Sequence, residues 1–231
     1  MNRRKFIGAS AAIAALALKD SVLPSHVVAA RTEPDFIPMP EIDASGPIDP
    51  QAFAPDSTPA ADRYLLPTPN RFGGGSLVQA LAMRRSTRAF VNRSISTNIL
   101  SDLLWSTWGI NRQDGRRTAP TARNNQNAEV YVALSDGIWL YNAGRNQLER
   151  KSRQDIREKT GPAPVILLYA APDDSDGAMT VGSLYQNAGL YCASAGLGNV
   201  VRSSKLGAAQ NALQIQDEYK IWVSQSIGWP S

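Results

Sequence analysis

The sequence has almost no histidine and almost no cysteine: His26 and Cys192 are the only residues of their kinds among 231. A single cysteine excludes an internal disulfide and a thiolate metal cluster. Its apolar helical surroundings predict a buried structural thiol. Because His26 lies in a segment that we expect to be removed, the remaining chain has no imidazole. This excludes histidine-based triads and zinc sites with histidine ligands, so any catalysis points to an organic cofactor.

The sequence also lacks an apolar run long enough to span a bilayer. Arg3 and Arg4 precede an alanine-rich apolar stretch at residues 9–18, which is shorter than the ~20 residues that a span needs. Small residues follow at 28–30, and this order of regions predicts an export signal over residues 1–30 that uses the twin-arginine export machinery. We expect a periplasmic or otherwise exported protein with no permanent membrane span. A tether through an uncleaved signal is the alternative.

Excess positive charge is absent once this segment is set aside. The chain has 24 basic and 20 acidic residues, of which four basic and one acidic lie in residues 1–30. The remainder therefore carries 20 basic and 19 acidic residues, a net charge of about +1. Such a chain has no charge excess for releasing counterions from a nucleic acid, so we expect no nucleic-acid partner.

Three parts follow from the distribution of proline and apolar residues. After the signal, residues 31–72 are rich in proline and show no helical or strand period, which predicts an extended leader that wraps the domain surface. Residues 73–231 are of the usual size for one domain. Trp105, Trp108 and Trp139 occur at helix or strand spacing, and we assign them to the core.

Hydrophobic periodicity and capping residues predict the elements of this domain. Ser76 and Ser96 are expected to cap two helices, the second of which ends at Gly109. Alternating apolar residues predict a hairpin, and a continuous apolar run predicts a buried strand. Helices around a largely antiparallel sheet define an α+β fold. The other predicted elements are the strands at 129–134, 138–141, 164–171 and 219–226 and the helices at 181–195 and 208–213.

The sequence Arg-Arg-Ser-Thr-Arg-Ala-Phe at residues 84–90 is the strongest chemical motif, and we call it the arginine motif. Guanidinium groups bind phosphate oxygens in pairs, and hydroxyls add neutral donors, so the motif favours a phosphate site. A solvated basic helix end is the alternative. A second cluster, the amide loop at residues 120–127, carries four amides, which can recognise the polar edge of a flavin ring. An ordinary turn is its alternative.

Four motifs in this order resemble the flavin-dependent nitroreductase superfamily. The arginine motif resembles the family's phosphate motif, and Pro-Thr-Ala-Arg-Asn-Asn-Gln in the amide loop is similar to its Pro-Ser-x-x-Asn-x-Gln. The helix at 185–198 resembles the long central helix, and Ile-Gly-Trp-Pro at 227–230 resembles the closing Ile-Gly-x-Pro. The export signal and residues 103–112 look most like an exported branch near the azoline-dehydrogenase-like oxidoreductases.

This resemblance implies a nitroreductase-like homodimer with FMN at its interface. It also implies ping-pong hydride transfer through flavin N5 between an electron donor and a small-molecule substrate. The implied cofactor contacts of one chain are Arg84, Arg85, Ser86 and Arg88, and those from the partner chain are Thr121, Ala122 and Asn124.

The sequence departs from the family at three places. A late Lys/Arg pair, which completes the phosphate clamp in typical members, is absent here, and Arg202 and Lys205 are the candidates to replace it. An acidic residue beyond the long helix and the lysine–tyrosine pair of azoline dehydrogenases have no counterpart. We therefore keep an alternative function, a non-catalytic binding or interaction module on the same fold.

Overall fold

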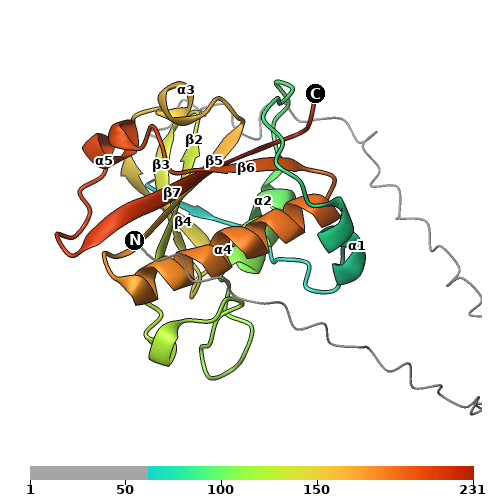
Figure 1. Ribbon diagram of the computed structural model, residues 1–231, viewed down its shortest axis with the longest axis horizontal. Helices are drawn as coiled ribbons and strands as arrows, with labels where there is room; N and C mark the ends of the chain where they lie inside the picture. The colour runs from blue at the N-terminus through green and yellow to red at the C-terminus, as the bar shows by residue number, and fades with distance from the viewer. Residues whose placement is uncertain (1–61) are drawn as a thin grey trace, which may run out of the picture. The chain divides into compact units, whose positions relative to one another are not determined.

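The computed structural model describes residues 62–231, so the predicted export signal and most of the predicted leader lie outside the described residues. This part of the chain contains seven strands and five α-helices (Figure 1). In chain order the elements are β1 (Arg63–Leu65), α1 (Leu77–Met83), α2 (Thr97–Trp108), the 3-10 helix η1 (Ala122–Asn124), β2 (Glu129–Leu134), β3 (Gly137–Asn142), β4 (Gln147–Ser152), α3 (Arg157–Thr160), β5 (Val165–Pro172), α4 (Ser175–Ser194), β6 (Gly198–Arg202), α5 (Gly207–Ala212) and β7 (Tyr219–Gly228).

The strands form one sheet in the order β1-β4-β3-β2-β5-β7-β6, and every neighbouring pair is antiparallel. Ser135 and Asp136 make the tight turn between β2 and β3, and Gly137, the first residue of β3, has a φ of +136°. The α+β fold with a mostly antiparallel sheet and flanking helices is therefore confirmed. The 10-residue strand β7 and the central strand β5 make the longest pairing in the sheet.

Helices cover both faces of the sheet, which explains why its central strands are apolar on both sides. Val130 and Val132 of β2 point into a core shared with α2 and α4, whereas Tyr131 and Ala133 between them point into a second core with α5. In Figure 1, α4 lies across one face of the sheet, with α1 beside its C-terminal end. Cys192 of α4 is fully buried in the first core, as predicted, and burial raises the pKa of its thiol.

Side-chain caps begin the three helices of this layer. The hydroxyls of Ser76 and Ser96 accept hydrogen bonds from the backbone N–H groups of Gln79 and Ile99, as the sequence predicted. The long helix begins at residue 175, six residues before the predicted start, because the Asp174 carboxylate accepts the Gly177 N–H at 2.7 Å. None of the helices within residues 62–231 has the length and apolarity that a membrane span requires.

Three strands were not predicted, and each has a weak sequence pattern. β4 is largely polar, and β6 follows directly from the glycine-rich end of α4. β1 lies within the predicted leader and pairs with β4 at one edge of the sheet. The described end of the leader, from residue 62, therefore belongs to the same sheet as the domain predicted for residues 73–231.

Candidate functional site

The arginine motif lies against the edge strand β6, immediately after α1. Arg84 caps the C-terminus of α1 through a hydrogen bond from its N–H to the Ala80 carbonyl. The chain then extends, and Ser86 forms a parallel bridge with Asn199 of β6. The Thr87 N–H donates to the Asn199 carbonyl at 2.8 Å. Helix and strand together fix where the motif begins.

A second anchor holds the far end of the motif on the residues that follow β7. Phe90 and Pro230 form an antiparallel bridge, and the Val91 N–H donates to the Trp229 carbonyl at 3.0 Å. The Ser231 N–H donates to the Ala89 carbonyl at 3.3 Å. The closing Ile-Gly-Trp-Pro segment and the arginine motif, which the sequence analysis treated as separate motifs, are therefore hydrogen-bonded neighbours.

Two paired glycines make room for this arrangement. Gly198 and Gly228 lie opposite each other at the β6–β7 end of the sheet. A Cβ at Gly198 would lie 2.7 Å from Thr87 Cγ2, and a Cβ at Gly228 would lie 2.7 Å from Pro164 Cδ and 3.1 Å from Phe90 Cδ1. These distances are shorter than van der Waals contact, so a larger residue at either position would push the motif away from the sheet.

A buried polar network supports Asn199 from the other side. Gln225 of β7 is fully buried, and its Nε2 donates to Asn199 Oδ1 at 2.9 Å. The Tyr169 hydroxyl donates to Gln225 Oε1 at 2.5 Å, and burial raises the pKa of Tyr169 well above its ordinary value. Gln225 Nε2 also reaches the Tyr185 carbonyl of α4 at 3.3 Å. Satisfied buried networks of this kind favour one geometry, here that of the strand that carries the motif.

The motif arginines (Arg84, Arg85 and Arg88) are exposed, and none of them forms a salt bridge with another residue of the described part of the chain. The side chains of Arg84 and Arg85 lie against different parts of the molecule. Arg84 passes Gly189 of α4, where a glycine Cβ would lie 3.9 Å from Arg84 Cδ. Arg85 lines a small cavity of about 160 Å³ together with residues 196–199 and Pro230. The motif thus presents guanidinium groups on an exposed surface without a competing carboxylate.

The amide loop is held in a strained conformation by its own side chains. Arg123, Asn124 and Gln126 have φ values of +52°, +58° and +47°, which L-residues adopt only when other contacts compensate. Gln126 provides those contacts: its N–H donates to Thr121 Oγ1 at 3.3 Å and its Nε2 to Asn124 Oδ1 at 3.2 Å. Backbone strain of this kind is typical of ligand-binding loops.

Arg117 fixes the same loop from behind. Its Nε donates to Gln126 Oε1 at 2.9 Å, its Nη1 donates to the Trp108 carbonyl at 3.1 Å, and its guanidinium lies over the Trp108 ring. Burial lowers the pKa of Arg117, an effect that nearby Tyr141 opposes. The sequence analysis did not single out Arg117, and it missed Asn199 and Gln225 as well, because each acts through contacts with distant segments.

Within one chain, the amide loop and the arginine motif lie on opposite sides of α4. Asn187 Nδ2 donates to the Thr118 carbonyl, just before the loop, at 3.4 Å, whereas Gly189 faces Arg84. Residues two positions apart on a helix point about 200° apart. Among the described residues, no hydrogen bond or salt bridge joins Thr121, Ala122 or Asn124 to the arginine motif. Within one chain, the two groups of predicted cofactor contacts are therefore held apart.

The two candidates for the late phosphate clamp lie away from the motif. Arg202 occupies the face of β6 opposite to Asn199, because side chains alternate along a strand. Its Nε lies 3.0 Å from where a Cβ at Gly161 would be. Lys205 is exposed in the following loop, with a φ of +61°. The structure does not bring either side chain to the motif of the same chain.

The predicted core tryptophans divide into two groups. Trp108 and Trp139 are buried, as predicted. Trp105 is half-buried and lines a cavity of about 620 Å³ beside the C-terminal part of α2. No group of three or more His, Cys, Asp or Glu side chains within residues 62–231 is arranged to hold a metal ion.

Comparison with known proteins relates this arrangement to one family. The model of the Nitroreductase family matches residues 81–229. A protein of Methanocaldococcus jannaschii named as a candidate nitroreductase is 25% identical over 151 residues, which cover 54% of this chain and 76% of the relative.

Solved structures show the same relation. A crystal structure of a candidate nitroreductase from Ralstonia eutropha JMP134 is 32% identical, covers 74% of this chain and 90% of its own, and superimposes with a TM-score of 0.68. A chain of the E. coli microcin synthetase McbBCD complex shares the fold at 17% identity, with a TM-score of 0.57 over 64% of this chain and 70% of that one.

Proposed function

The chain belongs to the nitroreductase family of flavin-dependent oxidoreductases, and we propose that it acts outside the cytoplasm as an FMN-dependent homodimer on a small molecule. The arginine motif is the observation that supports the cofactor. Its guanidinium groups are exposed and have no carboxylate partner within residues 62–231, and its backbone is anchored at both ends. Charge-assisted hydrogen bonds from such groups fit a phosphate.

The residues present fit a flavin mononucleotide at both of its ends. Arg84, Ser86 and Arg88 would hold the phosphate and ribityl chain, with Arg85 beside them. The amides and backbone of the amide loop would meet the polar ring edge, with Thr121 and Asn124 from the partner chain. Bound there, the flavin would supply hydride transfer between an electron donor and an acceptor. The protein's own part is to bind, orient and shield the ring, which agrees with the absence of histidine beyond residue 26.

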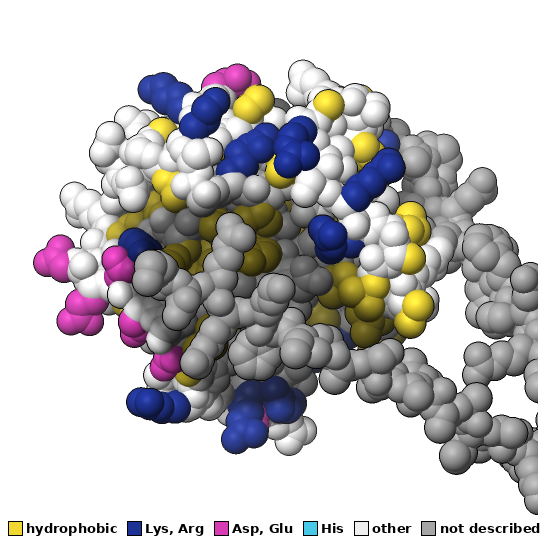
Figure 2. Space-filling model, in the orientation of Figure 1, with side chains coloured by type: hydrophobic (Ala, Val, Ile, Leu, Met, Phe, Trp, Pro, Cys, Tyr) yellow, Lys and Arg dark blue, Asp and Glu magenta, His cyan; other side chains and the backbone are white. Residues whose placement is uncertain are grey.

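A homodimer is supported by the apolar surface of α1 and by the separation of the two half-sites. Leu77, Val78, Leu81 and Met83 expose 64%, 76%, 51% and 50% of their surface, and Figure 2 shows apolar side chains gathered over α1 next to basic ones. Such a patch on a soluble domain favours burial against a partner. A second copy would also provide the amide loop that one chain keeps on the other side of α4.

Export is proposed from the N-terminal residues alone. Paired arginines before a short apolar run favour the twin-arginine machinery, which carries folded proteins and so suits a cofactor inserted before export. Replacing Arg3 and Arg4 by lysine should leave the protein in the cytoplasm, as cell fractionation would show. Unchanged export would contradict this part of the proposal. The exported branch near the azoline-dehydrogenase-like oxidoreductases is proposed on the pattern at residues 103–112.

Flavin content tests the central proposal directly. Protein from the exported fraction should be yellow and should release FMN on denaturation. Arg84→Ala with Arg88→Ala should lower FMN affinity at least ~100-fold, because each charge-assisted bond contributes ~1.5–3 kcal/mol. Arg116→Ala with Arg153→Ala, which removes two exposed guanidinium groups elsewhere, is the matched control. A colourless protein that cannot be reconstituted with FMN would overturn the proposal, and reduction and reoxidation of a bound flavin would exclude the non-catalytic alternative.

The dimer can be tested apart from the cofactor. Val78→Glu with Leu81→Lys should convert the protein to monomers in light scattering, because both side chains are charged and would have to be buried. Met179→Lys, at an equally exposed apolar position on α4, is the control and should leave the molecular mass unchanged. A dimer that survives the double substitution would show that α1 is not the interface.

A further inference from the structure

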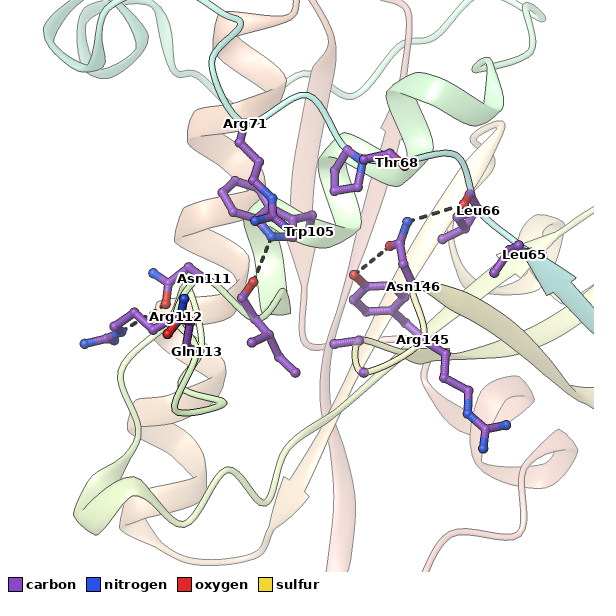
Figure 3. A pocket seen from close by; sticks show the side chains of 15 residues that line it. Leu65, Leu66, Thr68, Arg71, Trp105, Asn111, Arg112, Gln113, Arg145 and Asn146 are labelled. Atoms are coloured by element: carbon purple, nitrogen blue, oxygen red, sulfur yellow. Dashed lines mark hydrogen bonds between the residues drawn. The ribbon is translucent and has the colours of Figure 1, made fainter.

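A cavity of about 620 Å³ opens between β1, the C-terminal part of α2 and the turn between β3 and β4 (Figure 3). Its volume lies within the ~300–1,000 Å³ of small-molecule sites. It shares no lining residue with the small cavity beside Arg85 and therefore is separate from the arginine motif. Its lining residues are Leu65, Leu66, Thr68, Pro69, Arg71, Trp105, Ile110, Asn111, Arg112, Gln113, Tyr141, Ala143, Gly144, Arg145 and Asn146.

Hydrogen bonds hold the aromatic and amide groups of this cavity in place. Trp105 Nε1 donates to the Ile110 carbonyl at 3.2 Å, and the Tyr141 hydroxyl donates to Asn146 Oδ1 at 3.1 Å. Asn146 is fixed in turn, because its Nδ2 donates to the Pro67 carbonyl at 2.7 Å. In Figure 3, Trp105 lies on one side of the cavity and Asn146 on the other. Both walls are thus held by hydrogen bonds within the chain.

The charge of the lining has one sign. The cavity arginines (Arg71, Arg112 and Arg145) contribute three positive charges, and no acidic residue lines the cavity. None of the three forms a salt bridge within the described part of the chain. The Arg71 guanidinium lies 5.5 Å from the centroid of the Trp105 ring, and the other two extend outward from opposite sides of the mouth in Figure 3. Such a rim attracts anions, and Arg71 is placed to bind one.

We propose that this cavity binds a small aromatic acid, with its ring between Trp105 and Tyr141 and its carboxylate on Arg71. The aromatic walls match a planar apolar body, and the uncompensated guanidinium groups match an acidic head group. This binding is a second function of the chain, beyond flavin chemistry, and it does not require the flavin.

The probe for this site is 2-naphthoate, with the uncharged 2-naphthamide as its isostere, measured by calorimetry on the purified full-length protein. We expect naphthoate to bind at least ~10-fold more tightly than the amide, since a hydrogen bond to a charged group is the difference between them. Equal binding of the two compounds, or no naphthoate binding at millimolar concentration, would overturn the proposal.

Substitutions locate the binding. Arg71→Gln should weaken naphthoate about 10-fold, while Arg112→Gln with Arg145→Gln should weaken it less. The matched control is Arg116→Gln, which lies in the same loop as Arg112 but pairs with Asp114 outside the cavity. Flavin content should be unchanged in all of these variants. Naphthoate binding that resists Arg71→Gln but disappears in Arg84→Ala with Arg88→Ala would assign the ligand to the flavin site instead and refute the cavity.

Discussion

The motif arginines and the cavity arginines carry the same chemical group, but different interactions hold the two groups in place. The motif arginines lie within five residues of one extended segment, which backbone hydrogen bonds attach to β6 and to residues 229–231. The cavity arginines come from three segments separated by up to 74 positions, and side-chain hydrogen bonds organise the walls between them. The first group is positioned mainly by the sheet, the second mainly by its neighbours' side chains.

This difference leads to different expectations for substitution. A motif positioned by its backbone should keep its position when its own side chains are replaced, but should shift when the neighbouring strands β6 and β7 are altered. A cavity positioned by side chains should respond to changes in its walls and ignore the β6–β7 edge. Measuring FMN affinity and naphthoate affinity on the same variants separates the two supports.

The largest effect is expected from Gln225→Leu, which removes the centre of the network behind Asn199. The Tyr169 hydroxyl and Asn199 Oδ1 would lose their partners in a fully buried site, at a cost of about 3 kcal/mol in unfolding free energy. FMN affinity should fall together with the unfolding free energy, whereas naphthoate affinity should stay the same. Urea unfolding with Gln210→Leu, at an exposed position of α5, provides the control. A loss below about 1 kcal/mol would mean that the network contributes little to the motif's position.

A smaller effect is expected from Gly198→Ala. The added methyl group would lie 2.7 Å from Thr87 Cγ2, and relieving that overlap costs about 1–3 kcal/mol. Because the motif is the part that can move, we expect weaker FMN binding together with an unfolding free energy lowered by this amount. Gly207→Ala adds the same methyl group where nothing lies within 4 Å. Equal FMN affinity in both variants would show that the contact with Thr87 is dispensable.

Tyr141→Phe tests the side-chain hydrogen bonds that position the walls of the cavity. It removes the hydrogen bond to Asn146 in the cavity wall, which contributes about 1 kcal/mol. Naphthoate affinity should fall several-fold, while the flavin spectrum and FMN affinity stay as in the parent. Tyr64→Phe, at an exposed position of β1, controls for loss of a hydroxyl. If the flavin spectrum or FMN affinity changes and naphthoate affinity does not, the motif and the cavity are not positioned independently.

The smallest effect concerns an arginine that has a partner. Asp155 accepts from Arg157 at 2.8 Å, and this hydrogen bond lowers the pKa of Asp155. A lowered folded pKa stabilises the protein above the ordinary aspartate pKa, and that stability is lost as the pH falls through the folded value. Asp155→Asn should therefore flatten the decline in unfolding free energy below pH 4 by a few tenths of a kcal/mol, since the pair is partly exposed. Urea unfolding between pH 3 and 7 would show it, and identical profiles would refute it.

The sequence predicts the fold for identifiable reasons. The hairpin of β2 and β3, the buried strand β5 and the two serine caps follow from local patterns, and all are confirmed. The edge strands β1, β4 and β6 were missed because partners in the sheet, not periodicity, make them strands.

The same limit applies to side chains. Three arginines within five residues are visible in the sequence. By contrast, the contact of Asn199 with Gln225 spans 26 positions. Only after the chain has folded does Trp105 meet Arg71 and line the same cavity as Asn146. Trp105 was assigned to the core for this reason, although it lines the cavity. Conversely, the closeness of Ile-Gly-Trp-Pro to the arginine motif has no local sign at all.

That closeness sets an order of events during synthesis. Ala89 and Val91 are translated about 140 positions before Ser231 and Trp229, to which they are hydrogen-bonded. Contacts of such sequence separation form late, because the intervening chain must be ordered first. The arginine motif therefore emerges from the ribosome early but acquires its final shape only when the last strand has docked. Under the proposed function, a chain that has captured its cofactor at this motif has also completed its fold, so the bound cofactor would be a record of successful folding before export.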